Sequence, residues 1–371
     1  MKNLSILAAV LVSTSALAQV PPFTRITAPY QPLTSATVLS IANTDEGTAA
    51  ITLPFGFPFN GATYQTVYAH VNGQLLLTLP TACQPFTGSC TTYTSITGIP
   101  SAPAGWVQDA NFSTLFDWIE LTWELNASDT TLGANTTQVD MFGLPFNLSL
   151  AGSDAEGKPL TVQGGFSDAG LRHQILTALQ NAPAPWQQLV LTEAQSGLAT
   201  RAIAPYHGME MGLFPRTQLD DCIAQVWAKY TTETLTATAE GVTFNGQVVA
   251  DQLVFTPAAG TGETITFPKP DSFMVYTSGP LPLVDTTKAG VLKAALQAGF
   301  LRSTLLISTQ LPECDASRYY QAEPVNQYAR TFHEYGTNGG AYAFGFDDVC
   351  SHSSFIIVHN PQSAQLTLLA F

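Results

Sequence analysis

The order of apolar and polar positions divides the chain into two β-rich ends and a helical middle. Up to residue 165, short runs rich in Thr, Val, Ile, Phe and Tyr alternate with Pro, Gly and Asn. Such a rhythm is typical of strands joined by turns, and it favours a sandwich or a barrel. We therefore expect strands at 49–53, 65–71, 74–79, 116–124 and 135–141.

A helical spacing replaces this pattern near residue 164. Residues 168–181 place Leu171, Ile175 and Leu179 four positions apart, so the three side chains share one face of a helix. The hydroxyl of Ser167 is well placed to cap the first turn. The segment therefore predicts an amphipathic helix.

The segments that follow predict a mixed α/β region. Helical patterns fit 218–230, with Thr217 as the cap, and 286–300. Between them, Asn245-Gly246 separates two apolar runs, which predicts a hairpin turn. Strands and helices thus alternate here, unlike in the preceding part of the chain.

The last fifty residues return to β character after a helix near 325–335. A chain of 371 residues exceeds the usual size of one hydrophobic core, so we expect two domains. The final strands should rejoin the first domain, which would then comprise 19–165 and 320–371, with an α/β domain at 166–319. The expected strands are 341–346, 355–359 and 364–369.

The first residues indicate export. Lys2 precedes a short apolar run at 4–12, and a small-x-small cleavage pattern ends at Ala18. These features predict a signal peptide at 1–18. We therefore expect a secreted, extracellular protein with no membrane span.

The charge balance excludes one class of partner. Asp and Glu number 27 against 13 Lys and Arg, giving a formal net charge of −14. A nucleic-acid partner is therefore not expected, because phosphate contacts need basic side chains. Charged residues are only 11% of the chain, and hydroxyl and amide side chains supply most of its polarity, which suits a neutral, hydroxyl-rich ligand.

The cysteines do not form a disulfide-built scaffold. Five cysteines allow at most two bridges and leave one thiol over. Cys83 and Cys90 are close enough in sequence to close a small loop. The hydrophobic core must therefore supply most of the stability.

Two strand-like segments carry the strongest candidate chemistry. In 116–124, alternation places Trp118, Glu120, Thr122 and Glu124 on one polar face. If the second segment folds back as a hairpin, Asp140 lies opposite Glu120. Glycoside hydrolysis uses such a carboxyl pair, one as acid and one as base or nucleophile. Burial and like charge would keep one of them protonated.

The same pattern also fits an ordinary solvated sheet face. Acidic residues on the wet side of an antiparallel sheet are common. Trp118 argues for a ligand, because aromatic rings stack on sugars and a bare indole on a wet face is costly. Periodicity alone leaves both interpretations open.

At these residues the chain resembles the laminaripentaose-producing β-1,3-glucanases, glycoside hydrolase family 64, of the thaumatin-like superfamily. The stretches FDWIELTW and NTTQVDMFGLP carry the resemblance. It implies that Glu120 and Asp140 are the catalytic pair and that Thr122 and Thr137 bind glucan. DDCIAQVWAKY, FNGQVVADQLVF, FLRSTLL and AYAFGFDDV extend the likeness, which covers most of residues 65–360.

The resemblance also implies a fold and a mechanism. We expect a mainly β protein in which a thaumatin-like barrel or sandwich and a mixed α/β domain flank a wide groove. The reaction would be inverting, with Glu120 as acid and Asp140 as base, their carboxyls roughly 6.5–9.5 Å apart. Glu124 is a rival for the acid and another candidate substrate contact, because it shares the face of Glu120. Directly opposed strand residues would be nearer ~5 Å, so inversion predicts an offset between the two carboxylates.

Other candidate groups have competing interpretations. Asp347-Asp348 could hold sugar hydroxyls at the rim of the groove or serve turn chemistry. Arg302 could bind glucan or form a structural ion pair. His333-Glu334 lacks the second His of a zinc helix, so we expect no metal and no cofactor.

The sequence therefore predicts a secreted, monomeric hydrolase of β-1,3-glucan. The first alternative is a non-catalytic glucan-binding protein of thaumatin-like fold that keeps the groove. The second is a secreted structural or adhesive β protein, in which the acidic face is only a solvated surface.

Overall fold

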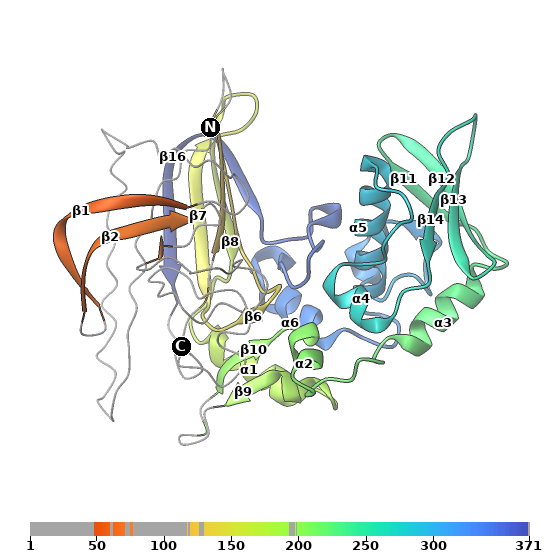
Figure 1. Cartoon of the computed structure of the whole chain (residues 1–371), viewed down its shortest axis with the longest axis horizontal. Helices are drawn as coiled ribbons and strands as arrows, with labels where there is room; N and C mark the ends of the chain where they lie inside the picture. Colours follow the sequence, from red (N-terminus) through yellow and green to blue (C-terminus); the bar gives the residue numbers. More distant parts are fainter. Residues whose placement is uncertain are drawn as a thin grey trace.

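A computed structural model describes residues 48–59, 62–70, 75–76, 117, 119–125, 130–192, 197 and 199–369 (Figure 1). Their strands form four open sheets with several helices packed between and against them. The first, three-stranded sheet consists of β1 (Thr48–Phe59), β2 (Ala62–His70) and β3 (Leu75–Leu76). The predicted signal peptide, Cys83, Cys90 and Trp118 lie outside the described residues.

A five-stranded antiparallel sheet in the order β4-β5-β16-β7-β8 joins the two β-rich ends of the sequence. The C-terminal strand β16 runs between β5 and β7 and replaces two predicted strands with one long one. Its members are β4 (Ile119–Leu125), β5 (Thr130–Thr136), β7 (Phe146–Ser153), β8 (Pro159–Gly165) and β16 (Ile356–Leu368).

One face of this sheet is apolar and buried. The side chains that form it come from three strands and lie at alternate positions, because successive residues of a strand project to opposite faces. They are Leu132, Ala134, Leu148, Leu150, Ile356 and Val358. The opposite face carries the polar residues of β4 and β5.

The remaining strands form a three-stranded sheet, β6-β10-β9, and a five-stranded sheet, β14-β13-β12-β11-β15. In Figure 1 the latter lies beside α3 and α5 on the right, the sheet of β7 and β16 lies on the left, and α6 lies between them. The strands are β6 (Met141–Phe142), β9 (Val190–Thr192), β10 (Ala199–Ile203), β11 (Leu235–Ala239), β12 (Val242–Val249), β13 (Gln252–Pro257), β14 (Ile265–Pro268) and β15 (Gln310–Leu311).

Four of the helices are those that the sequence predicts, at nearly the predicted bounds. In α1 the predicted apolar stripe of Leu171, Ile175 and Leu179 is buried in the larger core. The six α-helices described are α1 (Leu171–Gln180), α2 (Pro205–Glu210), α3 (Asp220–Lys229), α4 (Ser272–Thr277), α5 (Thr287–Leu301) and α6 (Gln327–Tyr335).

Both predicted helix caps are wrong. Helix α1 begins after Gly170, whose φ of 77° belongs to the left-handed region that glycine tolerates best, so Ser167 lies outside the cap. Helix α3 begins after Leu219, and no side chain caps it there, so Thr217 does not serve as its cap. The left-handed backbone of Gly170 therefore marks the start of α1.

The predicted Asn245-Gly246 turn is also wrong. Both residues lie inside the continuous strand β12. The turns lie on either side, at Glu240-Gly241 and Ala250-Asp251, where all four φ angles are positive. Gly246 serves packing instead, because a Cβ there would lie 2.5 Å from the ring of Phe255. Close approach of a ring, not a turn, requires this glycine.

The segment 341–346, predicted as a strand, forms turns and irregular structure instead. A buried ion-pair cluster described below fixes it. A disulfide joins Cys314 to Cys350, and Cys222 is a buried free thiol. No helix in the described part of the chain is long and apolar enough to cross a membrane.

Candidate active site

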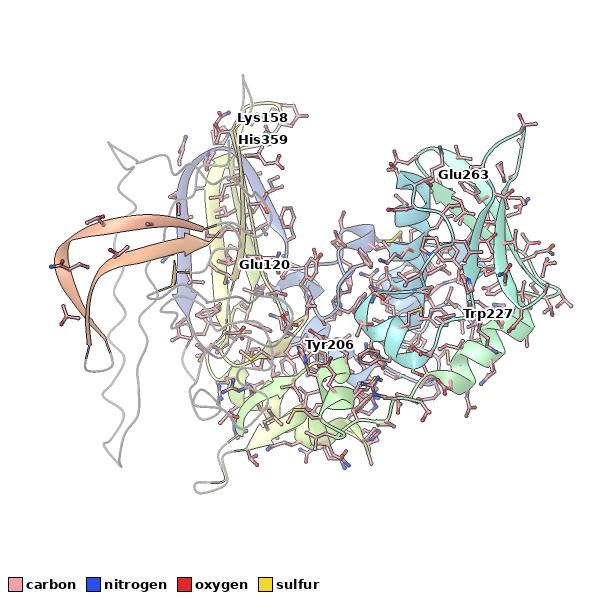
Figure 2. The ribbon with its side chains drawn as sticks, in the orientation of Figure 1. Glu120, Lys158, Tyr206, Trp227, Glu263 and His359 are labelled. Atoms are coloured by element: carbon pink, nitrogen blue, oxygen red, sulfur yellow. A yellow bond between two sulfur atoms is a disulfide. The ribbon has the colours of Figure 1, made fainter. Side chains whose placement is uncertain are left out.

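Glu120 projects from β4 onto the polar face of the five-stranded sheet (Figure 2). Its partner on β5 is Asn135, whose side-chain Nδ2 donates a hydrogen bond of 2.9 Å to Oε2 of Glu120. The predicted register, with Asp140 opposite Glu120, is therefore wrong. The strand predicted at 135–141 is also wrong, because β5 begins at Thr130 and ends at Thr136. The loop between β4 and β5 is therefore shorter than the predicted register assumes.

Asp140 lies four residues beyond the end of β5, in a bend before β6. Its own carbonyl accepts a hydrogen bond of 2.8 Å from the Ala204 amide. Upstream in the bend, the Gln138 amide donates to the Tyr342 carbonyl at 2.7 Å, and the Tyr328 hydroxyl donates to the Gln138 carbonyl at 2.7 Å. Contacts from three other parts of the chain therefore fix this bend.

Asp117 links the two candidate carboxylates through the backbone. One of its oxygens, Oδ2, accepts hydrogen bonds from the amides of Gly143 at 2.8 Å and Leu144 at 3.0 Å. Asp117 precedes Glu120 by three residues, and Gly143 follows Asp140 by three. Asp117 thus joins the residues just before β4 to the residues just after the Asp140 bend, and it fixes their relative position.

The carboxylate of Asp140 is held by the short helix α2. The hydroxyl of Tyr206 donates to Oδ1 of Asp140, and Nε2 of His207 lies 3.2 Å from the same oxygen. The other ring nitrogen of His207 lies 3.0 Å from Oε2 of Glu210. His207 is buried, whereas the Asp140 side chain is 34% exposed and so remains accessible.

The two carboxylates have different surroundings. Burial raises the pKa of Glu120 above its usual value, Asn135 opposes this, and the negative charge of Asp140 raises it further. Part of the Glu120 side chain remains exposed, so its carboxyl is still accessible. Burial and Asp140 also raise the pKa of Tyr206, so its hydroxyl stays a donor. One carboxyl is thus suited to hold a proton, and the other accepts hydrogen bonds.

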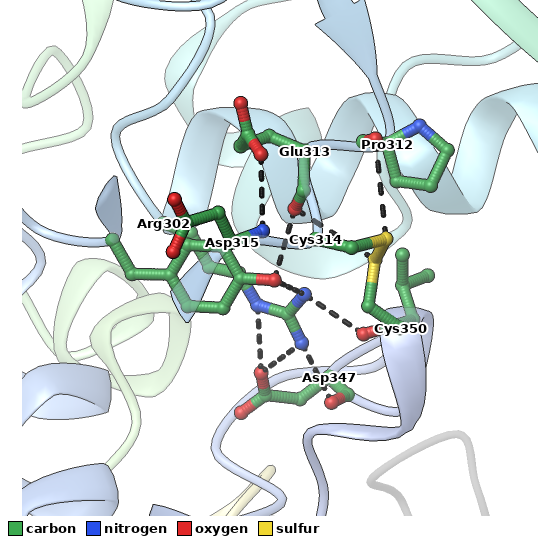
Figure 3. The surroundings of a disulfide bond; sticks show 9 residues. Arg302, Pro312, Glu313, Cys314, Asp315, Asp347 and Cys350 are labelled. Carbon is green, nitrogen blue, oxygen red and sulfur yellow. Dashed lines mark hydrogen bonds and ion pairs between the residues drawn. A yellow bond between two sulfur atoms is a disulfide. The ribbon is translucent and has the colours of Figure 1, made fainter. Parts of the chain in front are cut away.

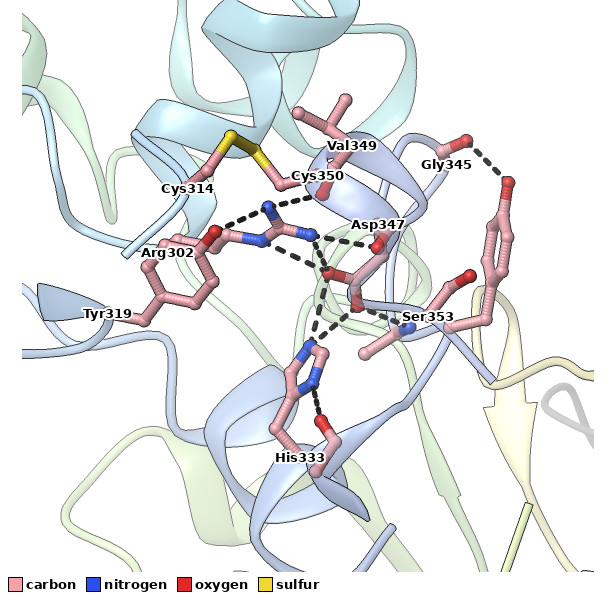
Figure 4. Close-up of polar contacts among 12 residues, drawn as sticks. Arg302, Cys314, Tyr319, His333, Gly345, Asp347, Val349, Cys350 and Ser353 are labelled. Carbon is pink, nitrogen blue, oxygen red and sulfur yellow. Dashed lines mark hydrogen bonds and ion pairs between the residues drawn. A yellow bond between two sulfur atoms is a disulfide. The ribbon is translucent and has the colours of Figure 1, made fainter. Parts of the chain in front are cut away.

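A buried charge cluster supports the loop beside Glu120. Arg302 and Asp347 form an ion pair of 3.0 Å, and His333 lies 2.9 Å from the second oxygen of Asp347 (Figure 4). The ion-pair interpretation of Arg302 is confirmed, and Asp347 is wholly buried, not at an exposed rim. Figure 3 shows the disulfide adjoining this cluster.

Tyr342 brings this loop to the candidate site. Its pKa is raised by burial first and then by the negative charges of Asp348, Glu120 and Asp347. The tyrosine therefore lies within electrostatic reach of Glu120. It comes from the segment that the sequence predicted as a strand.

Comparison with known proteins shows the family of this chain. The family model described as β-1,3-glucanase, glycoside hydrolase family 64, matches residues 85–368. The chain belongs to this family. A second model, described as NIDO related, matches residues 22–109.

Curated relatives of the family include the glucan endo-1,3-β-glucosidases of Cellulosimicrobium cellulans and of Arthrobacter sp. (strain YCWD3). Each is 31% identical over 268 residues, which cover 71% of this chain. The chain spans about half the length, 47%, of these two relatives.

Solved structures of the family share the fold. A laminaripentaose-producing β-1,3-glucanase in complex with laminaritetraose matches with a TM-score of 0.64 at 31% identity, over 82% of this chain and 78% of the other. A β-1,3-glucanase domain from Clostridium beijerinckii matches with a TM-score of 0.62 at 21% identity, over 92% and 91%. The second likeness concerns the fold alone.

The structure also locates the other residues that the family resemblance suggested. Thr122 and Glu124 are exposed on the face of Glu120. Glu124 lies four residues further along β4, about 13 Å away, in the direction opposite to Asp140. Thr137 is buried, and its hydroxyl accepts a hydrogen bond from the Val139 amide at 3.4 Å. The predicted glucan contacts of these residues remain predictions.

Sequence reasoning missed the residues that support the pair. Asn135 lies in the predicted segment 135–141, but the predicted register placed Asp140 opposite Glu120 instead. Tyr206, His207 and Glu210 lie more than sixty positions from Asp140, on a helix of six residues that carries no periodic signal. Among the described residues, no group of three or more His, Cys, Asp or Glu is arranged to hold a metal ion.

Proposed function

We propose that this chain hydrolyses β-1,3-glucan by a two-carboxylate mechanism with Glu120 as general acid and Asp140 as general base. One observation carries the proposal: the charge of Asp140 reaches Glu120, whose pKa is raised, while tyrosine and histidine side chains contact Asp140 itself. Paired carboxyls in unlike surroundings are what glycoside hydrolysis needs. Membership of a β-1,3-glucanase family supports the choice of substrate.

Glu120 would supply the proton to the leaving group. A carboxyl with a raised pKa keeps its proton to higher pH than an ordinary glutamic acid and can donate it to the glycosidic oxygen as the bond breaks. Asn135 bonds Oε2 and orients the group, leaving the rest of the exposed carboxyl for substrate. After donation, the hydrogen bond from Asn135 stabilises the carboxylate that remains.

Asp140 would take the proton from the attacking water. The donor from Tyr206 and the contact with His207 hold Oδ1, so Oδ2 is available to the water. The offset of Asp140 beyond β5 supports inversion, because a directly opposed pair would have the short separation of a retaining enzyme. We therefore propose inversion of the anomeric centre.

The substrate assignment agrees with the names of relatives and with the surface. The two curated relatives are named glucan endo-1,3-β-glucosidases, and one solved relative is a complex with laminaritetraose. The low charge content and the exposed Thr122 suit a neutral polymer. We also propose a thaumatin-like arrangement of the β part and, from the predicted signal peptide, secretion.

Two assays on the purified chain test this function. Reducing-sugar release from laminarin should occur, and proton NMR of the first product should show the α-anomer. A product that first appears as the β-anomer would overturn inversion while leaving hydrolysis intact. Binding of laminarin without any release of reducing sugar would instead favour the glucan-binding alternative.

A further inference from the structure

One aromatic side chain is exposed beside the proposed catalytic pair. Phe355, the residue before β16, is 42% accessible to solvent. A large apolar ring on a polar sheet face needs an explanation, because burying it against the protein would be more favourable. Its position on that face suggests the reason.

The ring of Phe355 lies over a glycine on the neighbouring strand. A Cβ on Gly133 would lie 2.6 Å from Cζ and 2.7 Å from Cε2 of the ring. Such approaches are closer than any side chain permits, so the ring occupies the space that a side chain at this position of β5 would take. Gly133 therefore allows the ring to lie against the sheet.

The ring shares the face of the acid. Residues two apart on a strand project to the same side, so the space above Gly133 and the side chain of Asn135 lie on one face. Asn135 contacts Glu120 on that face. Gly133 and Asn135 are two residues apart on β5, which is about 7 Å along the strand. The ring over Gly133 is therefore offset from Glu120 by about that distance along the strand direction.

The ring is held in place and flanked by accessible side chains. In the ladder, Gly133 pairs with Thr122 on one side and with Ile357 on the other. Thr122 is exposed, and Ile357 is 44% accessible. Beside the ring, the Ser354 hydroxyl donates to the Thr136 carbonyl at 2.6 Å, which anchors the start of β16 to the end of β5.

We propose that Phe355 is a stacking platform for a glucosyl unit next to the bond that is cleaved. The inference rests on the proposed function and names a binding position within it. A β-linked glucose carries its hydroxyls around the ring edge and presents C–H groups on its flat faces, which pack on an aromatic surface. Polar groups from β4 can then bond the hydroxyls, the usual division of labour in a ligand site.

A protein partner fits this position less well. The exposed apolar residues on this face are Phe355 and Ile357, and the exposed carboxylate of Glu120 and hydroxyl of Thr122 lie on the same face of the sheet. A surface that combines an apolar ring with polar groups suits a ligand that is apolar on its faces and hydroxylated at its edges. A sugar meets that description without any change in the sheet.

Kinetics on laminarin and on a β-1,3-linked glucose hexamer test the platform. We expect Phe355→Leu to raise KM about tenfold, equivalent to about 1.4 kcal/mol, with kcat within about twofold of the wild type. Phe355→Tyr should keep the wild-type KM because it keeps the ring. Leu283→Ala, which trims a side chain that is 60% exposed on another part of the chain, serves as the matched control and should change neither constant.

A second variant moves the ring without removing it. Gly133→Ala places a methyl group where the tip of the Phe355 side chain lies, so the ring must swing aside. It should raise KM in the same way as Phe355→Leu, with circular dichroism confirming that both variants remain folded. An unchanged KM in both variants, with an active wild type, would overturn the platform alone.

Calorimetric titration with the hexamer separates the two proposals. If the wild type binds the hexamer without cleaving it, the catalytic proposal fails, and weaker binding by Phe355→Leu still supports the platform. If the wild type neither binds nor cleaves, both proposals fail. Equal binding by wild type and Phe355→Leu would reject the platform whatever the activity.

Discussion

Removal of the Arg302 guanidinium should destabilise the protein strongly, because it leaves a buried carboxylate short of donors. Arg302 is 1% exposed and Asp347 is fully buried. The guanidinium donates to Oδ1 of Asp347 from two nitrogens, at 3.0 and 3.3 Å, and also to the carbonyls of Asp347 and Val349, both at 2.8 Å. Arg302→Met fills much of the volume but supplies none of these donors.

The expected loss is about 3 kcal/mol in the free energy of unfolding. Breaking a buried ion pair by removing one partner costs about 3–5 kcal/mol. The lower end applies because Asp347 keeps His333 at 2.9 Å and accepts a bond from the Ala343 amide at 2.9 Å. Against a typical total of about 5–15 kcal/mol, this is a large fraction.

The pH dependence has a definite sign. Burial alone would raise the pKa of Asp347, but His333 and Arg302 outweigh it and hold the pKa below its usual value. A depressed pKa contributes stability above the unfolded-state pKa of about 3.9, and that stability is lost as the pH falls through the lower, folded-state pKa. Acid should therefore weaken the wild type more than Arg302→Met.

Urea unfolding followed by circular dichroism measures the effect, and a double variant isolates its cause. Arg302→Met combined with Asp347→Leu removes both charges, so it should be more stable than Arg302→Met alone by at least about 1 kcal/mol. Recovery stays incomplete because His333 loses its acceptor. A single variant within about 0.5 kcal/mol of the wild type, or a double variant less stable than either single one, would refute the reasoning.

Three further changes test other parts of the structure. Asn135→Ala removes a hydrogen bond that lowers the pKa of Glu120, so the alkaline limb of the kcat/KM profile should move to higher pH; a shift to lower pH would contradict the assignment of the acid. Tyr206→Phe removes a donor from Asp140, so laminarin hydrolysis should fall about tenfold or more in kcat with KM nearly unchanged. Gly246→Ala should cost about 1–3 kcal/mol of stability by denaturant unfolding, because a buried ring fills the space; a neutral result would argue against the strand assignment.

Local patterns predicted four of the helices and the strand at 116–124 well, because the helical and strand periods repeat within a few residues. The apolar positions of 168–181 lie on the buried face of α1, and the strand alternation of 116–124 places Glu120 and Thr122 on the polar face of β4. These results follow from the helical and strand periods alone. The sequence therefore indicates which face of β4 is polar.

Long-range features were not available from such patterns. The register between β4 and β5 differs from the expected one by five residues, because the loop is shorter than assumed and Asp140 lies past the strand. The glycine at 246 reflects a ring from the next strand, not a turn. The side chains that hold Asp140 arrive on α2, which only the tertiary fold brings near.

The central claim is that Glu120 and Asp140 together hydrolyse β-1,3-glucan. The most direct measurement is the rate of reducing-sugar release from laminarin by Glu120→Gln and Asp140→Asn, with Glu124→Gln as the matched control on the same strand. We expect each of the first two to lose activity by a factor of about 10² or more, and the control to keep a kcat close to that of the wild type. Full activity in Glu120→Gln or Asp140→Asn, or loss of kcat only in Glu124→Gln, would contradict the assignment.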